Sequence, residues 1–152
     1  VTKKLMVDLQ ESILDDVSRE LFDLSVRFGV QNLEGMVLKP NKLDILQGGA
    51  SLTFTKLSPG ERLRVRIAAA LAVLKVARER GYGRHPGLIV MDSPGAQEMS
   101  DDDFSELVRA TASAIEEVPG VQVLVGAVSR PFLREVVPFA RRRECVGDEY
   151  MF

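Results

Sequence analysis

Two apolar runs separated by an amphipathic segment are the feature of this sequence that most constrains its fold. The run GLIVMD at 87–92 is apolar up to its final Asp92, and VQVLVGAV at 121–128 is apolar except for Gln122. Such runs are typical of the buried strands of a parallel sheet. The segment 100–118 has the pattern of an amphipathic helix, and 131–140 predicts a second, shorter helix. With a terminal strand expected in 141–152, this order predicts an α/β fold with a mostly parallel sheet flanked by helices.

The first half of the chain predicts a long helix, a small strand meander and a further helix. In residues 4–28 apolar side chains recur at steps of three or four, so a coiled-coil-like helix should end near Gly29. The segment 35–56 looks like a two-strand meander of MVLK and LDIL, with Gly48-Gly49 as a turn before the alternating SLTFT. A helix is then expected over 57–80.

Length and composition indicate a single globular domain over 1–152, with the first helix in 1–30 and an α/β lobe in 31–152. The net charge of −2 gives no overall attraction to nucleic acid. The single cysteine, Cys145, excludes an internal disulfide and predicts a cytoplasmic setting. The longest apolar run, 67–74, is too short to cross a bilayer, so no membrane partner is expected.

The stretch LSPGE opens the helix expected over 57–80, and it has two interpretations. Ser58 can cap the helix, with Pro59 as its first residue and Glu61 closing a capping box. Alternatively, Ser58, Gly60 and the free helix N-terminus can together bind a phosphate. On these residues alone both interpretations stay open.

Polar residues follow each apolar run, at the strand ends where ligands of parallel α/β sheets bind. Asp92 ends the first run, and Ser129 follows the second. A carboxylate in this position can hold Mg²⁺, or the water around it, next to a phosphate. The alternative is that Asp92 and Ser93-Pro94-Gly95 only form a turn after the strand.

The order of these features resembles the C-terminal lobe of an SMC-type or RecN-type ABC ATPase head, and the resemblance covers nearly the whole chain. In that family a returning coiled-coil helix and a strand meander precede a signature motif at a helix start. A Walker B strand, a D-loop, a helix and a strand ending in a switch residue follow. The matching pieces are 1–28, 35–56, LSPGE at 57–61, LIVMD at 88–92, PGAQEM at 94–99 and VLVGAVSR at 123–130.

The resemblance implies an ATPase that works as a dimer of two heads. The residues Leu57 to Glu61 would contact, in trans, the γ-phosphate of ATP held by the other head, and Asp92 would hold Mg²⁺ directly or through water. ATP would join the heads and hydrolysis would release them. The family acts on DNA in repair, chromosome organisation or defence, which implies DNA as a partner and a cytoplasmic place, at the nucleoid in bacteria. The five signature residues are Leu57, Ser58, Pro59, Gly60 and Glu61.

Three departures from the family pattern change what the resemblance implies. No G-x-x-x-x-G-K-[ST] is present, so the Walker A lobe is expected on another polypeptide or on a segment that precedes this chain. Ser93 stands where the catalytic glutamate usually follows Walker B, which leaves Glu98 as the nearest carboxylate and Gln97 to position water. Ser129 or Arg130 stands in place of the switch histidine, and Arg130 could contact phosphate instead.

A second class of function stays open beside the ATPase. Ser93 and the missing histidine favour a non-catalytic ABC-like module that dimerises or scaffolds without ATP turnover. A Ser–His–Asp triad with His85 is not favoured, because no G-x-S-x-G elbow is present. Asp101, Asp102 and Asp103 are expected to complement the dipole of the helix they begin rather than to hold a metal.

Overall fold

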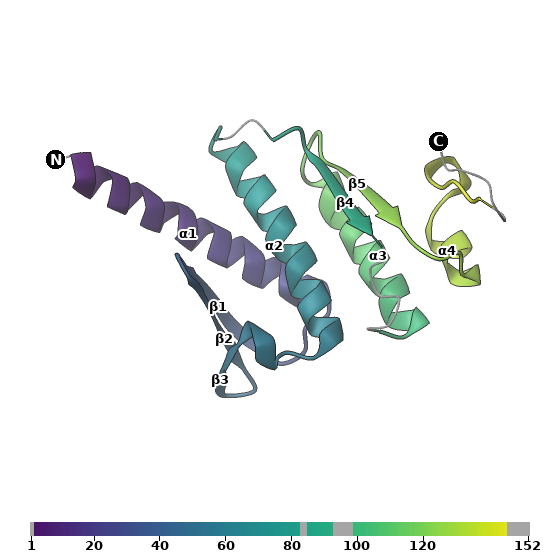
Figure 1. The fold of residues 1–152 in the computed structure, drawn as a ribbon, viewed down its shortest axis with the longest axis horizontal. Coiled ribbons are helices and arrows are strands. Elements are labelled where there is room, and N and C mark those ends of the chain that lie inside the picture. The colour runs from purple at the N-terminus through teal and green to yellow at the C-terminus, as the bar shows by residue number, and fades with distance from the viewer. Residues whose placement is uncertain (1, 83–84, 93–98, 146–152) are drawn as a thin grey trace.

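Helices flank two small sheets in the computed structural model, which describes residues 2–82, 85–92 and 99–145 (Figure 1). All four predicted helices are present: α1 (Thr2–Arg27), α2 (Pro59–Glu79), α3 (Asp101–Glu116) and α4 (Pro131–Val136). The strands are β1 (Leu33–Lys39), β2 (Lys42–Gln47), β3 (Ala50–Thr53), β4 (Leu88–Asp92) and β5 (Gln122–Gly126). Two short 3-10 helices are η1 (Phe54–Lys56) and η2 (Phe139–Arg141).

The first three strands form an antiparallel meander beside α1. Met36 of β1 pairs with Ile45 of β2, and both side chains are buried in the core. The two-strand prediction is corrected here, because SLTFT adds a third strand and then enters η1 at Phe54. Ser18 of α1 covers the free edge of β1, since its hydroxyl accepts a hydrogen bond from the Leu38 amide at 2.7 Å.

The last two strands, β4 and β5, form a parallel pair with α3 as the crossover between them. Val90 lies opposite Leu124, and Asp92 lies opposite Gly126. The mostly parallel sheet is not confirmed, because the strands in the described residues divide into three antiparallel and two parallel ones. The expected terminal strand is absent from residues 142–145, and residues 146–152 lie outside the described part of the chain.

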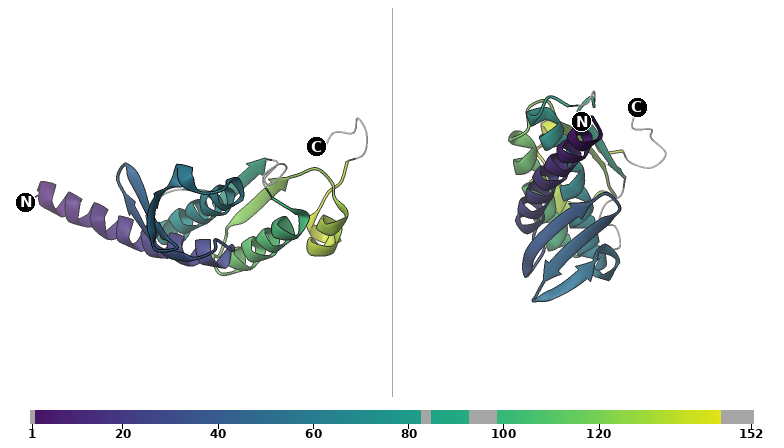
Figure 2. Two further views of the ribbon diagram at one scale, coloured as in Figure 1. Left: turned by 90° about the horizontal axis from the view of Figure 1, so that it is seen from below. Right: turned by 90° about the vertical axis from the view of Figure 1, so that its left-hand side faces the viewer.

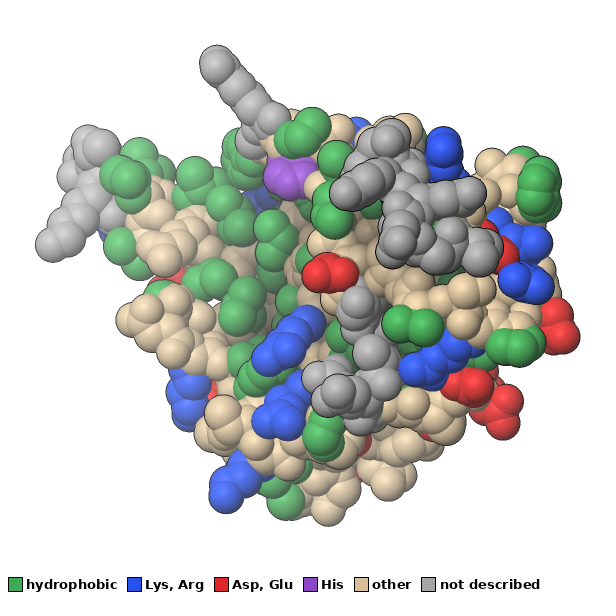
Figure 3. Space-filling view, turned by 45° about the vertical axis from the view of Figure 1, so that its right-hand side comes forward, with side chains coloured by type: hydrophobic (Ala, Val, Ile, Leu, Met, Phe, Trp, Pro, Cys, Tyr) green, Lys and Arg blue, Asp and Glu red, His purple; other side chains and the backbone are tan. Residues whose placement is uncertain are grey.

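One face of the β4–β5 pair is open, which corrects the prediction of two buried strands. Ile89, Met91 and Val123 pack towards the core on the side where α3 lies (Figure 2). On the other face Val90 is 68% and Leu124 is 57% exposed. Figure 3 shows hydrophobic side chains gathered on this side of the molecule. A shallow hollow of about 510 Å³ lies between α2 and β4, lined by Ala69, Ala70, Val73, Leu74, His85, Leu88 and Ile89.

The N-terminal part of α1 extends beyond the rest of the molecule (Figures 1 and 2). Leu5 and Leu9 are 62% and 46% exposed there, whereas Val17, Leu21 and Leu24 are buried in the core. The predicted apolar stripe of α1 is therefore covered only over its C-terminal half. None of the helices in the described residues combines the length and apolarity that crossing a membrane requires.

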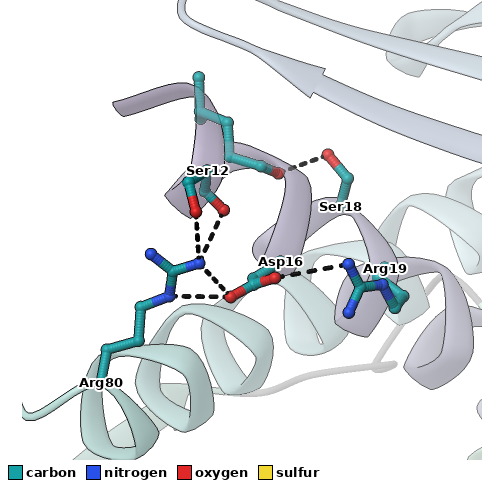
Figure 4. Close-up of polar contacts among 6 residues, drawn as sticks. Ser12, Asp16, Ser18, Arg19 and Arg80 are labelled. Carbon is teal, nitrogen blue, oxygen red and sulfur yellow. Dashed lines mark hydrogen bonds and ion pairs between the residues drawn. The ribbon is translucent and has the colours of Figure 1, made fainter. Parts of the chain in front are cut away.

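Ion pairs from α2 hold α1 in place. Arg80, at the end of α2, donates from Nε to Asp16 Oδ2 at 2.8 Å and from Nη2 to Ser12 Oγ at 2.8 Å (Figure 4). Lys75 Nζ lies 2.8 Å from Glu20 Oε1, one helical turn further along α1. Both pairs are partly shielded from water, so they fix the position of α1 on α2 more firmly than exposed pairs would.

Candidate functional site

The predicted capping box at the start of α2 is present. Ser58 has extended backbone angles, φ −61° and ψ 158°, and Pro59 is the first helical residue. The Ser58 hydroxyl accepts a hydrogen bond from the Glu61 amide at 3.3 Å and donates one to Glu61 Oε2 at 2.7 Å. The Ser58 amide donates to the same carboxylate oxygen at 2.9 Å. These bonds satisfy backbone groups that would otherwise lack partners at the helix end.

Gln47, at the end of β2, supports the capping box from outside the helix. Its Nε2 donates to Glu61 Oε1 at 2.7 Å and to the Gln31 carbonyl at 2.8 Å. Burial raises the pKa of Glu61, but the hydrogen bonds from Ser58 and Gln47 lower it more, so the pKa lies below its ordinary value. Sequence reasoning missed Gln47, because nothing in the strand pattern indicates which helix end it will meet.

The five residues of LSPGE differ in how accessible they are. Ser58 and Pro59 are exposed, whereas Leu57 is 4% exposed and belongs to the core. Gly60 is also buried. Leu57 therefore anchors the start of α2, and the Ser58 hydroxyl is the polar side-chain group that an approaching anion would meet first.

Asp92 lies where the sequence predicted, as the last residue of β4. It is exposed, and its Oδ1 lies 3.6 Å from the position that a Cβ on Gly126 would occupy. The small residue on β5 therefore leaves room beside this carboxylate. The described residues contain no group of three or more His, Cys, Asp or Glu side chains that could hold a metal ion. Asp92 thus offers one carboxylate. A single carboxylate suits a cation such as Mg²⁺, which takes most of its other ligands from water and phosphate oxygens.

The remaining predicted residues divide between described and undescribed parts of the chain. Ser93, Gln97 and Glu98 lie outside the described residues. Ser129 is exposed after β5, and Arg130 directly precedes α4. Arg130 Nη1 lies 2.5 Å from Asp101 Oδ1, which ties the start of α4 to the first turn of α3.

The starts of α2 and α3 lie side by side, an arrangement that sequence reasoning did not find. Ser100 caps α3 as Ser58 caps α2: its hydroxyl accepts from the Asp103 amide at 3.2 Å and donates to Asp103 Oδ2 at 2.7 Å. Arg64 of α2 reaches the same carboxylate, with Nη2 at 2.7 Å from Oδ1. Hydrogen bonds from Ser100 and Arg64 lower the pKa of Asp103. Both helices begin on the side towards which β4 and β5 point (Figure 1).

The aspartates in the first turn of α3 form ion pairs and a hydrogen bond at the start of that helix. Asp101 pairs with Arg130, and Asp103 pairs with Arg64 and Ser100. These contacts place negative charge at the positive end of the α3 dipole.

Two solved structures have folds similar to this chain. One is an SMC head bound to the C-winged helix domain of ScpA, with a TM-score of 0.57, 10% sequence identity and coverage of 81% of this chain. The other is the SMC head domain from Thermotoga maritima, with a TM-score of 0.52, 14% identity and coverage of 86%. No family model and no curated protein matches the sequence.

The likeness establishes an SMC-head-like α/β fold for this chain. The chain spans less than half the length of either solved head, 37% of one and 44% of the other.

Proposed function

We propose that this chain is the C-terminal lobe of an ATPase head that joins a second copy of itself when ATP is bound. The observation that carries the proposal is the exposed, capped N-terminus of α2, with Ser58 at its tip, in a chain that has an SMC-head-like fold. A helix of this length presents a positive dipole end, which suits an anion.

In this proposal the signature residues of one head contact the γ-phosphate of ATP held by the other. The Ser58 hydroxyl, which donates to Glu61 Oε2 in the unbound chain, would rotate to donate to a phosphate oxygen. The Ser58 amide would keep its bond to Glu61 and so preserve the start of the helix. Leu57 and Gly60, both buried, would position this tip rather than meet the nucleotide first, and Pro59 would lie beside it.

The donor set at the end of β4 fits Mg²⁺ bound with ATP. Asp92 is a single exposed carboxylate, and Mg²⁺ in nucleotide sites uses one or two carboxylates together with water and phosphate oxygens. Bound there, the cation would neutralise charge that develops on the phosphates. Asp92 would orient it, Glu98 would accept the proton of the attacking water, and Gln97 and Ser93 would position that water. Ser129 and Arg130 would sense the phosphate from the end of β5.

The open face of β4 and β5 supports the proposal that a further lobe completes the head. Parallel sheets are normally covered on both faces, and Val90 and Leu124 are exposed apolar residues on the open one. The sequence has no Walker A motif, so the phosphate-binding loop and its lysine would come with that lobe. DNA would be a further partner, in the cytoplasm and, in a bacterium, at the nucleoid. The ScpA complex of one solved head supports the expectation of a protein partner as well.

A non-catalytic module that dimerises or scaffolds without ATP turnover is the second candidate. Ser93 follows Asp92 where a glutamate is usual in the resembled family, and no histidine follows β5. The Arg130–Asp101 ion pair favours this candidate too, because it gives Arg130 a structural role.

The proposal can be tested with the completed head, which is this chain together with its Walker A lobe. Analytical ultracentrifugation with Mg²⁺ and a slowly hydrolysed ATP analogue should give a dimer that is absent without nucleotide. Steady release of inorganic phosphate from ATP would identify the ATPase. A nucleotide-dependent dimer without turnover would identify the scaffold, and no dimer under either condition would refute both.

A further inference from the structure

The Gln47 side chain bridges the loop after α1 and the first turn of α2. Its Nε2 donates to the Gln31 carbonyl at 2.8 Å and to Glu61 Oε1 at 2.7 Å. A primary amide nitrogen carries two hydrogens, and both of these neighbours are acceptors. The two contacts therefore use the full donor capacity of the amide and fix which way it faces.

The backbone of Gln47 is held from both sides. Gln47 is the last residue of β2, the central strand of the meander, and it pairs with Leu33 of β1 and Ala50 of β3. The next residue, Gly48, donates its amide to the Asn32 carbonyl at 2.9 Å. The Nε2 group is thus presented to the start of α2 from a well-supported position in a sheet.

The Glu61 carboxylate divides its two oxygens between Gln47 and Ser58. Oε1 accepts from Gln47, whereas Oε2 accepts from the Ser58 amide at 2.9 Å and from the Ser58 hydroxyl at 2.7 Å. If the hydroxyl turns away, each oxygen therefore still has one donor. Glu61 is partly buried, where a carboxylate oxygen without a donor costs free energy.

The bond from Gln47 also weakens the hold of Glu61 on the Ser58 hydroxyl. Burial raises the pKa of Glu61, and the hydrogen bonds from Ser58 and Gln47 lower it below its ordinary value. A carboxylate with a lowered pKa is a weaker base, and a weaker base accepts a hydrogen bond less strongly. The hydroxyl of Ser58 is therefore released from Glu61 at a smaller cost when Gln47 is in place.

We infer that Gln47 is a positioning residue that allows the Ser58 hydroxyl to leave Glu61 and donate to the γ-phosphate of ATP. The inference rests on the proposed function for the identity of that phosphate. Both Gln47 donors are engaged within the chain, so Gln47 acts through Glu61 and not on the nucleotide. It also keeps the carboxylate from following the hydroxyl towards the anion, since Oε1 is held to the loop after α1.

Carbon-13 NMR of the Glu61 carboxyl tests the shared charge on this chain alone. Gln47→Met keeps the length of the side chain and removes both donors, so the pKa of Glu61 should be higher in this variant than in the wild type. Arg64, on the same helix, also lowers this pKa and is retained. Gln47→Lys keeps a donor and should leave the pKa low. An unchanged pKa in Gln47→Met would overturn the inference.

Dimerisation of the completed head tests the effect on Ser58. With Mg²⁺ and a slowly hydrolysed ATP analogue, Gln47→Met should weaken the dimer about fivefold, while ATP binding to the single head stays unchanged. Gln47→Lys should restore the dimer. Glu34→Met is the matched control, because it removes a hydrogen bond of the same turn, between Glu34 Oε1 and the Gly49 amide at 2.8 Å. It should dimerise like the wild type.

A Glu61→Gln background separates positioning from support of the fold. An amide oxygen accepts less strongly than a carboxylate, so the Ser58 hydroxyl is already easy to release there. Adding Gln47→Met to Glu61→Gln should then weaken the dimer by less than about twofold. An equal loss in both backgrounds, or an equal loss in Glu34→Met, would overturn the inference by giving Gln47 a purely structural role.

The wild type distinguishes failure of the inference from failure of the proposed function. If the wild-type head forms no nucleotide-dependent dimer, the proposed function fails and the inference fails with it. If the wild type dimerises and Gln47→Met dimerises equally well, only the inference fails.

Discussion

Arg64 of α2 and Asp103 of α3, which are 39 residues apart in the sequence, form an ion pair of 2.7 Å that joins the N-terminal parts of the two helices. The Arg64 side chain is only 11% exposed, and its Nε is buried without a hydrogen-bond partner among the described residues. A Cβ at Gly29, just after α1, would lie 3.6 Å from that nitrogen. Arg64 is therefore packed where the ends of three elements meet, and it ties the position of the Ser58 tip to that of α3.

Removing the Asp103 charge should destabilise the chain. Asp103→Asn leaves a nearly buried guanidinium without its anionic partner, which should lower the free energy of unfolding by about 1–3 kcal/mol. Urea denaturation followed by circular dichroism measures this change. Asp102→Asn is the matched control, because Asp102 is exposed in the same helical turn, and it should change stability by less than about 0.5 kcal/mol. Equal effects of the two substitutions would mean that only the helix dipole matters.

Glu61 should make stability depend on pH in acid. Its pKa is lowered in the folded chain, so the ionised carboxylate stabilises the fold at pH values above its ordinary pKa of about 4.3. This contribution is lost as the pH falls through the lowered, folded-state pKa. In Glu61→Gln the amide does not titrate, so the stability difference between wild type and variant should shrink as the pH falls. Urea denaturation in a series of buffers from neutral to acid measures it, and a difference that stays constant would contradict the role of the Glu61 charge.

Local sequence signals predicted the parts of the fold that depend on neighbouring residues. The start of α2 was predictable because Ser58, Pro59 and Glu61 satisfy the helix end among themselves. The start of α3 at Ser100 has the same cause. The parallel pairing of β4 and β5 followed from two apolar runs separated by a helix.

Contacts between distant residues were not predictable from one sequence. The residues around Arg64 in the sequence give no indication that it pairs with Asp103 on another helix. Apolar runs also do not reveal what covers them: Val90 and Leu124 have the residue types of a buried strand, yet they are exposed in this chain. That mismatch between residue type and exposure is the observation behind the proposal that a further lobe covers this face.

Gly87 should be far less tolerant of a side chain than Gly49, although both have left-handed backbone angles, with φ of +85° and +76°. A Cβ on Gly87 would collide with the carbonyl oxygen of Gly120, whereas nothing lies within 4 Å of a Cβ on Gly49. Gly49→Ala should cost about 1 kcal/mol from backbone strain alone, and Gly87→Ala several times more. Thermal unfolding of the two variants compares them directly. Similar melting temperatures would mean that the turn before β5 moves easily.

Asp92→Asn should reduce Mg²⁺-dependent ATP turnover by the completed head at least about tenfold, because it removes the charge proposed to hold the cation. The substitution keeps the size of the side chain beside Gly126, so the fold should persist. Phosphate release at limiting Mg²⁺ is the measurement, with Asp102→Asn as a control that removes an exposed carboxylate elsewhere. Unchanged turnover in Asp92→Asn would assign Asp92 to the turn after β4 only.

A carboxylate at position 58 distinguishes two roles proposed for Ser58, which are to cap α2 and to contact the γ-phosphate of ATP. Aspartate caps helices as well as serine does, but the Ser58 hydroxyl lies 2.7 Å from Glu61 Oε2, so Ser58→Asp alone would place two carboxylates in contact. The informative variant combines Ser58→Asp with Glu61→Gln, whose amide can donate to the new carboxylate. Its reference is Glu61→Gln alone.

If Ser58 only caps α2, the double variant and its reference should have similar melting temperatures and form the ATP-dependent dimer equally well. If Ser58 meets the γ-phosphate, the melting temperature should stay while the dimer is lost, because like charges in a desolvated interface repel by several kcal/mol. ATP binding to the single completed head should persist. Thr55→Asp, which adds a carboxylate to an exposed residue of η1, controls for a general effect of charge near the tip. Sedimentation with a slowly hydrolysed ATP analogue distinguishes these outcomes, and a double variant that still dimerises would leave LSPGE as a helix cap.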